Sequence, residues 1–456
     1  MKITKKGFVF VFLVVSSASF SESAIENRAQ HIQGKTQPTV GSLFFPHRAS
    51  TTHNNLASTN SFESAEICRA CHQEIYNEWR SSMMANSWED PIYRALLKKA
   101  SEETDGAIDY FCTGCHSPAG LLTGKINSQV NRTLPEEDSI HLPGVDCDAC
   151  HRMTGISGLT NGAYILDANT DVNVKRGPRR DADSPYHQTE YSTLHKQSEM
   201  CGACHNVSHP FNDIPIERTY DEWYESAYRT QGVECQDCHM PRVQGRAAIM
   251  GPMREDRASH HFSSANTTII ERFGDHQSVE TARKFLQTSA TIEFVDLPRG
   301  LSAGGVHNIK VKVTNVGAGH KLPTGFPEGR EVWIDLQVLN HNNEEVYRLG
   351  QVSNGKTEPG TKNFKVHLGN AHGEEVDIEV WTVDRILSDN RILPNGYATE
   401  TYRVPVPDNL NGPLTLNATL YYWPFSQAFA DHLLGKDKIN VSIEQLAATS
   451  QTIQIH

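Results

Sequence analysis

The apolar residues near the C-terminus alternate with polar residues along several short runs. Residues 307–316 (HNIKVKVTNV) alternate strictly, and residues 333–338 and 414–420 repeat this pattern. Runs of period two that are separated by Gly, Asn and Pro clusters predict antiparallel strands, each with one buried face. Two sheets of such strands bury their apolar faces against each other, so residues 291–456 are predicted to form an antiparallel β-sandwich domain.

Two other segments have a composition of their own. Residues 25–62 are rich in Ser, Thr, Asn, Gln and His and contain few large apolar residues, which is typical of a flexible lead-in. His31, His47 and His53 in this segment are interpreted as solvated histidines. Residues 279–290 (VETARKFLQTSA) are predicted to form a helix or a helical linker.

The N-terminal 24 residues have the pattern of a secretory signal peptide. A basic start with Lys2, Lys5 and Lys6 is followed by an apolar stretch over residues 8–15 and then by small residues. That stretch is too short to span a bilayer, and no later segment has the roughly 18 apolar residues that a spanning helix needs. The sequence therefore predicts an exported chain without a membrane span, in the periplasm or at the cell surface.

The charge of the chain argues against nucleic acid as a partner. The formal net charge is −12 at pH 7, and removal of residues 1–24 deletes three Lys and one Glu, which makes it −14. An acidic chain without a basic patch has no electrostatic footprint for a phosphate backbone.

The cysteines identify the candidate chemistry. All ten belong to Cys-x-x-Cys-His units, which we number in chain order. They are motif 1 (Cys68, Cys71, His72), motif 2 (Cys112, Cys115, His116), motif 3 (Cys147, Cys150, His151), motif 4 (Cys201, Cys204, His205) and motif 5 (Cys235, Cys238, His239). This spacing is the attachment signal for haem c, in which two thiols bind the porphyrin and the adjacent imidazole binds iron. Disulfides or zinc sites would not explain a His after the second Cys five times out of five.

Five covalent haems change the expected fold of residues 63–290. A segment of this length has little room for a conventional core beside five porphyrins, so the porphyrins would supply the apolar interior. Short helices and loops are expected to wrap around them. The fold class expected for the whole chain is therefore α+β and multidomain, with a multihaem cytochrome c domain ahead of the sandwich.

A weak internal repeat lies within this region. The pattern Y-x-E-W-x-x-S occurs at residues 76–82 and again at residues 220–226, and Gly-Val-x-Cys precedes both motif 3 and motif 5. The aromatic residues Trp79 and Trp223 are interpreted as packing against haems, and a role in electron relay is the alternative.

Together these motifs resemble the multihaem superfamily that includes hydroxylamine oxidoreductase and its tetrahaem cytochrome electron acceptor. The resemblance covers residues 63–290 and rests on four places. They are motif 1 with Trp79-x-x-Ser82, Gly-Val-x-Cys before motifs 3 and 5, Ser198-Glu-Met before motif 4, and Met240-Pro241 with His260-x-Phe262 after motif 5. A C-terminal sandwich with residues 317–325 (GAGHKLPTG) also recurs in such cytochromes. The resemblance implies close-packed haem pairs and periplasmic electron transfer, with redox catalysis on nitrogen or sulfur species in some members.

The second axial ligand of each iron decides whether it can bind a substrate. The family commonly reads W-x-x-S-x-H-A after motif 1, and this chain has Met84 where that His would stand. A thioether ligand is chemically reasonable, and the alternative is Met as a core filler. His187 and His195 lie where the family places a ligand-bearing stretch upstream of motif 4. His260 matches a family ligand position, with His261 as its rival.

His320 is a further candidate ligand in the Cys-free region. It lies between Gly319 and Lys321, from where a loop could reach a haem, or the side chain could simply cap the turn. His141 and His209 are reserve candidates. The other histidines are interpreted as surface or packing residues.

Two classes of function follow from these residues. The first is electron transfer between redox partner proteins. The second is a haem enzyme that oxidises or reduces a small nitrogen or sulfur oxyanion at one open iron. No motif ends in the Lys that marks the catalytic haem of pentahaem nitrite reductases, and five haems fall short of the eight of hydroxylamine oxidoreductase. Electron transfer is therefore favoured, and a sandwich that binds a partner protein or a surface polymer is compatible with either class.

Overall fold

The computed structural model describes residues 43–126, 143–168, 172–274, 276–326 and 329–456. The predicted signal peptide, His31 and His141 lie outside the described residues. No helix in the described part is long and apolar enough to cross a membrane.

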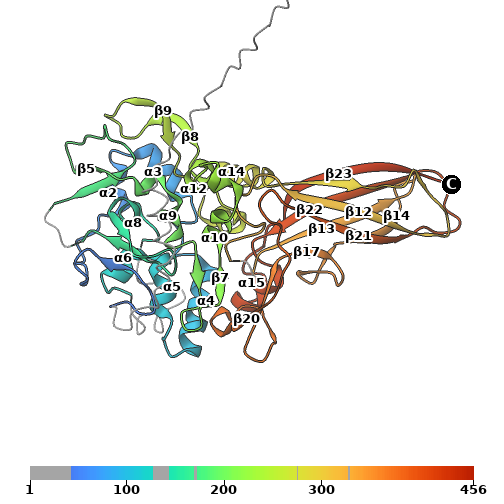
Figure 1. Cartoon of the computed structure of the whole chain (residues 1–456), viewed down its shortest axis with the longest axis horizontal. Coiled ribbons are helices and arrows are strands. Elements are labelled where there is room, and N and C mark those ends of the chain that lie inside the picture. The colour runs from blue at the N-terminus through green and yellow to red at the C-terminus, as the bar shows by residue number, and fades with distance from the viewer. Residues whose placement is uncertain (1–42, 127–142, 169–171, 275, 327–328) are drawn as a thin grey trace, which may run out of the picture. The chain divides into compact units, whose positions relative to one another are not determined.

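Short helices dominate the first part of the chain, as expected (Figure 1). They are α2 (Ala65–Arg69), α3 (Gln73–Arg80), α4 (Pro91–Glu103), α5 (Asp109–His116), α6 (Pro118–Leu122), α8 (Cys147–His151), α9 (Ser198–Gly202), α10 (Thr219–Tyr224), α11 (Ala227–Thr230), α12 (Cys235–His239), α13 (Thr267–Phe273) and α14 (His276–Gln287). Between them lie short strands, β1 (Ser50–Thr51), β2 (Met153–Ile156), β3 (Tyr164–Leu166), β4 (Val174–Gly177), β5 (Gln188–Tyr191), β6 (Val207–Ser208), β7 (Pro215–Glu217), β8 (Arg242–Arg246) and β9 (Met253–Ala258). Helix α14 covers most of the helix predicted at residues 279–290.

The haem-attachment motifs lie on or at the ends of one- or two-turn helices. Positions i and i+3 of a helix share a face, and so do i and i+4, so both cysteines and the histidine of a motif project to one side. Two of these helices, α8 and α12, begin with acidic caps. Asp146 accepts the N–H of Ala149 at 2.9 Å at the start of α8, and Glu234 forms a capping box with Asp237 at the start of α12.

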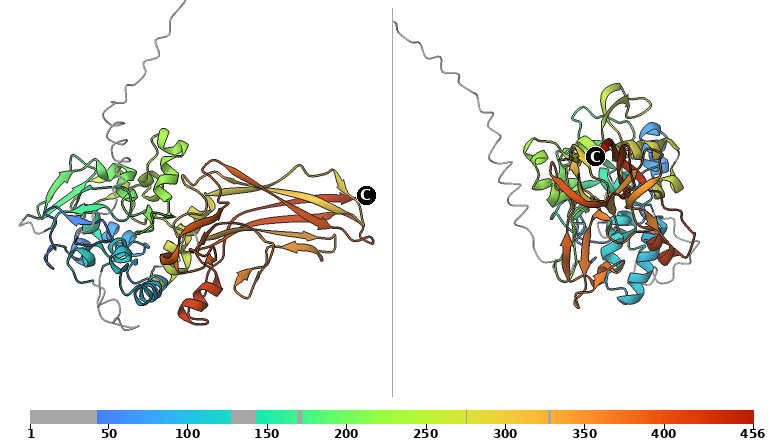
Figure 2. Two further views of the ribbon diagram at one scale, coloured as in Figure 1. Left: turned by 60° about the horizontal axis from the view of Figure 1, so that its bottom comes forward. Right: turned by 90° about the vertical axis from the view of Figure 1, so that its right-hand side faces the viewer.

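The second part is made mostly of long antiparallel strands, which run side by side in Figures 1 and 2. One sheet has the order β10 (Ala290–Val295), β12 (Val306–Asn315), β21 (Tyr397–Pro405). The other has the order β11 (Gly300–Leu301), β23 (Glu444–Ile455), β22 (Leu414–Trp423), β13 (Glu331–Leu339), β14 (Glu345–Leu349), with β17 (Lys362–Phe364) also paired to β13. The three period-two runs of the sequence lie almost entirely on β12, β13 and β22, which confirms their prediction as strands.

The two sheets share one apolar core. Ile309, Val311 and Val313 of β12 are fully buried in the same cluster as Leu336 of β13 and Leu416 of β22. Smaller elements complete this part of the chain. They are β15 (Val352–Ser353), β16 (Lys356–Thr357), β18 (Val366–Gly369), β19 (Glu375–Val376), β20 (Arg385–Asp389) and α15 (Gln427–Leu434). The chain therefore has the α+β class that its sequence predicts.

The described part of the predicted lead-in, residues 43–62, differs from the expectation. Strand β1 pairs in parallel with β3, and Phe44 and Ala49 are buried against an apolar cluster that contains Tyr164. His47 is only 1 % exposed, so it is not a solvated histidine, whereas His53 is exposed as predicted. This segment packs because its few apolar residues cover the apolar surface of β3.

Candidate multihaem site

One connected cavity of about 1610 Å³ runs through the first part of the chain and reaches the second. All fifteen Cys and His residues of motifs 1 to 5 line it. The five predicted second ligands, Met84, His187, His195, His260 and His320, line it as well. The rival His261 and the reserve candidate His209 are not among the lining residues that the structure describes. The cysteine thiols and the imidazoles therefore line one shared cavity.

The imidazoles of four motifs are oriented in the same way. Each uses Nδ1 to donate a hydrogen bond to a main-chain carbonyl, so the lone pair of Nε2 is free to bind a metal. The acceptors are Ala247 for His72 at 2.7 Å, Ser87 for His116 at 3.0 Å, Arg176 for His151 at 2.6 Å and Ser263 for His239 at 2.7 Å. Desolvation inside the protein lowers the pKa of His116 and of His239 to about 4, which keeps both rings neutral at pH 7.

His205 of motif 4 is the exception. Its Nδ1 lies 3.5 Å from a carboxylate oxygen of Glu217. Desolvation lowers the pKa of His205, but the hydrogen bond and the charge of Glu217 outweigh it and raise the pKa to about 9. A carboxylate partner makes the ring a stronger donor to a metal than a carbonyl partner does.

Three pairs of histidine rings have the separation that iron coordination from both sides requires. The ring centres are 6.4 Å apart in each pair, with interplanar angles of 22–28°. The pairs are His72 with His187, His151 with His260, and His239 with His320. An imidazole nitrogen binds a metal ion such as zinc at about 2.0–2.1 Å and lies about 1.1 Å from its ring centre, so two rings on opposite sides of one ion have centres about 6 Å apart. The donor set therefore fits haem iron at motifs 1, 3 and 5.

The second member of each pair also uses Nδ1 for a carbonyl. His187 donates to Gln188 at 3.1 Å, His260 to Ala258 at 3.0 Å and His320 to Lys321 at 2.9 Å. All three rings thus keep Nε2 free, which is the tautomer that an axial ligand needs.

His195 lies near the same motif as His260 but is oriented differently. Its ring centre is 5.6 Å from that of His151, and its Nε2 hydrogen-bonds the carbonyl of Cys150 at 3.1 Å. Its Nδ1 is buried and has no hydrogen-bond partner among the described residues. The geometry favours His260 over His195 as the partner of His151, and a ligand role for His195 stays a prediction.

Met84 lines the cavity beside motif 3. Its carbonyl accepts the N–H of Val145, two residues before Cys147, at 2.8 Å. Its neighbour Met83 packs against apolar clusters around Ile92 and Ile270, to which Met84 does not belong in the described part of the chain. Met84 is thus no core filler of these clusters, and its role as an iron ligand stays a prediction.

The motifs are neighbours in an order that differs from their order in the chain. The side chains of Cys68 and Cys147 are neighbours, and α2 packs against α8, so motif 1 lies beside motif 3. In the same way Cys201 contacts Cys235, and α9 packs against α12, so motif 4 lies beside motif 5. Motif 2 reaches motif 4 through Cys115, which interacts with Cys204.

Two residues of the site, Tyr93 and His47, are not predicted from the sequence as parts of it. Tyr93 stacks on the ring of His116 with ring centres 3.6 Å apart and an interplanar angle of 3°. His47 fills the space beside motif 2, where a Cβ on Gly114 would lie 2.2 Å from its Nε2. Because Nδ1 of His47 accepts the N–H of Ala49 at 3.0 Å, its proton is on Nε2 and the ring is not set up to bind a metal. Gly114 within motif 2 and Gly162 are the visible traces of this contact.

Comparisons with known proteins agree with this reading of the fold. Residues 67–152 match the family described as cytochrome c554 and c-prime. No curated protein matches the chain. The crystal structure of a penta-heme cytochrome c552 from Thermochromatium tepidum is similar over 86% of this chain and 99% of that chain, with a TM-score of 0.63 and 18% identity.

Other solved structures match a smaller share of the chain. The CARDB domain of the PF1109 protein from Pyrococcus furiosus and the human F-spondin reeler domain each match 37% of this chain and 86% and 93% of their own, with TM-scores of 0.16 and 11% identity. At these TM-scores the likeness carries no functional inference. The five motifs and the shared fold are those of a multihaem c-type cytochrome, and residues 67–152 are similar to the cytochrome c554 and c-prime family.

Proposed function

We propose that the chain binds five haem c groups and transfers electrons between redox partner proteins outside the cytoplasm. The observation that carries this proposal is the single cavity on which all fifteen motif residues converge. Haem c held there supplies one-electron chemistry, and the protein sets its potential through the axial ligands and their hydrogen bonds. The ten cysteines anchor the porphyrins, and His72, His116, His151, His205 and His239 bind the irons.

The paired histidines support electron transfer rather than catalysis at motifs 1, 3 and 5. His187, His260 and His320 face the motif histidines at the spacing of two axial ligands, which leaves no open position for a substrate. The contacts between neighbouring motifs bring the attachment cysteines together in two series, motif 1 to motif 3 and motif 2 through motif 4 to motif 5. The charge interaction between Cys150 of motif 3 and Cys201 of motif 4 links the two series. Such continuity is what passage of electrons along the protein needs.

A second candidate function is catalysis at one open iron. In the described part of the chain, no histidine ring is paired in this way with His116 or His205. Met84 and His195 are the predicted ligands left for these two motifs. Motif 4 also differs from the other motifs because its histidine, His205, has the Glu217 carboxylate as a partner. If one of these irons keeps an open face, oxidation or reduction of a small nitrogen or sulfur oxyanion becomes possible there.

The location and the domain organisation are part of the proposal. c-type cytochromes are extracytoplasmic, and residues 1–24 have the pattern of a signal peptide, so we assign the mature chain to the periplasm or the cell surface. We propose a pentahaem domain over residues 63–290 and a sandwich domain over residues 291–456.

The test combines mass and spin state. The intact mature protein is expected to carry five haem masses, and its ferric spectrum should show at least three low-spin irons. Cyanide or nitrite should leave those three unchanged. Four or fewer covalent haems would contradict the pentahaem assignment. Binding of cyanide by four or five irons would contradict the three histidine pairs and favour an enzyme.

A further inference from the structure

The two copies of Y-x-E-W-x-x-S occupy equivalent places in the structure. Trp79 of α3 donates a hydrogen bond from Nε1 to the carbonyl of Val145 at 2.9 Å, and Trp223 of α10 donates to Val233, also at 2.9 Å. Each Val stands two residues before the first Cys of a motif, motif 3 in the first copy and motif 5 in the second. The Trp of each copy therefore holds the backbone that enters a haem-attachment motif.

The Glu before each Trp binds the segment that carries the second histidine of the same motif. Glu78 accepts the main-chain N–H of His260 at 2.8 Å and two hydrogen bonds from Arg257 at 2.9 and 2.6 Å. The side chains of Glu78 and Arg257 are 14% and 7% exposed, so this contact is largely shielded from solvent. His260 is the ring that faces His151 of motif 3.

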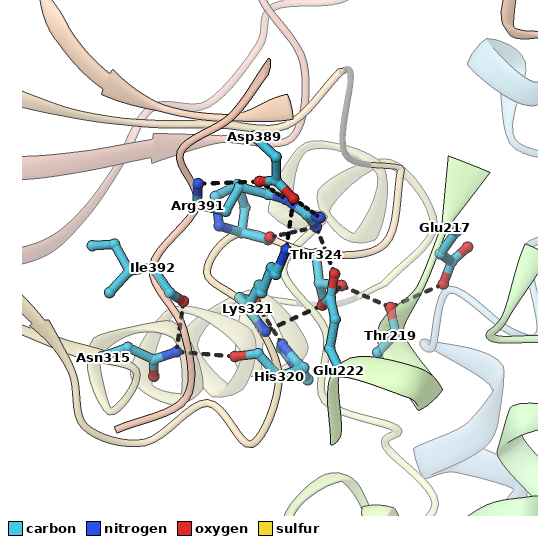
Figure 3. Close-up of polar contacts among 11 residues, drawn as sticks. Glu217, Thr219, Glu222, Asn315, His320, Lys321, Thr324, Asp389, Arg391 and Ile392 are labelled. Atoms are coloured by element: carbon cyan, nitrogen blue, oxygen red, sulfur yellow. Dashed lines mark hydrogen bonds and ion pairs between the residues drawn. The ribbon is translucent and has the colours of Figure 1, made fainter. Parts of the chain in front are cut away.

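The second copy repeats the arrangement across the two parts of the chain (Figure 3). Glu222 accepts the main-chain N–H of Lys321 at 3.1 Å and the hydroxyl of Thr324 at 2.8 Å. It also pairs with Arg391 at 2.9 Å, with both side chains at most 5% exposed. Lys321 directly follows His320, which is the ring that faces His239 of motif 5.

We propose that Glu78 and Glu222 are positioning residues that set the axial coordination of motifs 3 and 5. Adjacent Glu and Trp side chains on one short helix tie the segment of the second histidine to the backbone of the motif that carries the first. The distance between the two imidazoles is thereby fixed by one rigid element. This inference rests on the proposed haem ligands and adds the residues that hold them in place.

The two copies are not equally protected against loss of the carboxylate. Arg257 depends on Glu78, since Glu74, its other acidic neighbour, is 60% exposed and 3.8 Å away. Arg391 is also held by Asp389, through hydrogen bonds of 2.9 and 2.8 Å. Asn315 additionally donates to the carbonyl of His320 at 2.9 Å. Removal of Glu78 should therefore disturb its site more than removal of Glu222 disturbs the other.

The experiment compares Glu78→Gln and Glu222→Gln in the full-length protein with its haems. The matched controls are Glu74→Gln, one turn earlier on α3, and Glu225→Gln, an exposed residue next to α10. The readouts are the high-spin signal of the ferric protein and a redox titration. Loss of a hydrogen bond to a charged group should weaken binding of the second imidazole about tenfold or more. We expect one new high-spin fraction in Glu78→Gln, a smaller one in Glu222→Gln, none in the controls, and a return to low spin on addition of free imidazole.

Two reference variants separate this inference from the proposed function. His260→Ala and His320→Ala should each open one iron. If they do so while Glu78→Gln and Glu222→Gln match their controls, the positioning role is wrong and the ligand assignment stands. If the histidine variants also stay fully low-spin, the ligand assignment fails and the inference falls with it. If Glu78→Gln does not mature with five haems, Glu78→Asp takes its place. The shorter side chain keeps a negative charge for Arg257 but moves the acceptor away from the N–H of His260. An unchanged spin-state spectrum of Glu78→Asp would overturn the inference.

Discussion

The two parts of the chain are built on different interiors. The strand-rich part has one continuous apolar core, in which fully buried residues of both sheets share a cluster. The motif-bearing part has smaller clusters in its described residues, arranged around a cavity of about 1610 Å³. It shares one further cluster with the strand-rich part, through Ile92 and Ile269. One part buries apolar side chains against each other, and the other needs its cofactors to fill its centre. Stability should therefore depend on packing in the strand-rich part and on haem attachment in the motif-bearing part.

Production of the full chain without haem maturation should cause the largest difference in stability between the two parts. The motif-bearing part would lose the groups that fill its cavity and should become accessible to protease, because unfilled apolar space of this size is not sustained by small clusters. The strand-rich part should keep its amide protection, which hydrogen exchange would measure. Equal protection of both parts in the haem-free chain would contradict the distinction.

Shortening a side chain in the shared core should have the next largest effect. Leu416→Ala removes a fully buried side chain from β22 and should lower the free energy of unfolding of the strand-rich part by about 2–5 kcal/mol. Leu393→Ala is the control, since Leu393 is 60% exposed. Denaturant unfolding followed by far-UV circular dichroism measures the change. The haem spectrum should be the same in both variants, and a shift in redox potential would contradict independent interiors.

A cavity residue of the motif-bearing part should show the reverse behaviour. Met84→Ala is expected to open one iron and change its potential, because the thioether is predicted to be its second ligand. Met84→His should keep that iron low-spin and lower its potential by roughly 100 mV or more, since imidazole favours ferric iron over a thioether. A redox titration with spin-state spectra measures both.

Met83→Ala is the matched control for this ligand prediction. Met83 lines the cavity too, but it packs against Ile92 and Ile270, so its loss should reduce stability and leave every potential in place. If Met84→Ala changes neither spin state nor potential, Met84 is not a ligand, and a histidine such as His195 serves that iron.

The sequence predicts whatever short-range chemistry determines. The alternation along β12, β13 and β22 is visible because every second side chain of a half-buried strand must be apolar. The five motifs are visible because thioether attachment fixes the spacing of two thiols and an imidazole. The pairing of His151 with His260 and the contact between motifs 1 and 3 join residues that are far apart in the chain. No local pattern records such contacts.

The burial of His47 and the carboxylate partner of His205 escaped prediction for a related reason. His47 is enclosed by Gly114 and Gly162, which come from two distant segments. The composition of a Ser-, Thr- and His-rich segment predicts exposure to solvent. Only the folded chain shows that the segments of Gly114 and Gly162 cover it. The repeat was visible in the sequence, but its purpose was not, because Arg257 and Arg391 stand in unrelated local contexts.

The smallest expected effect comes from the tryptophans of the repeat. Trp79→Phe and Trp223→Phe keep an aromatic ring but remove the hydrogen bond to Val145 or Val233, which should cost about 0.5–1.5 kcal/mol of stability in each variant. If the rings only pack and hold the motif backbone, rapid-mixing measurements should give unchanged rates of electron flow through the protein. A rate that falls in either variant while all five potentials stay in place would favour the electron-relay role instead. Because Trp79 and Trp223 make the same contact at motifs 3 and 5, a change in one variant alone would show that the two copies have diverged in function.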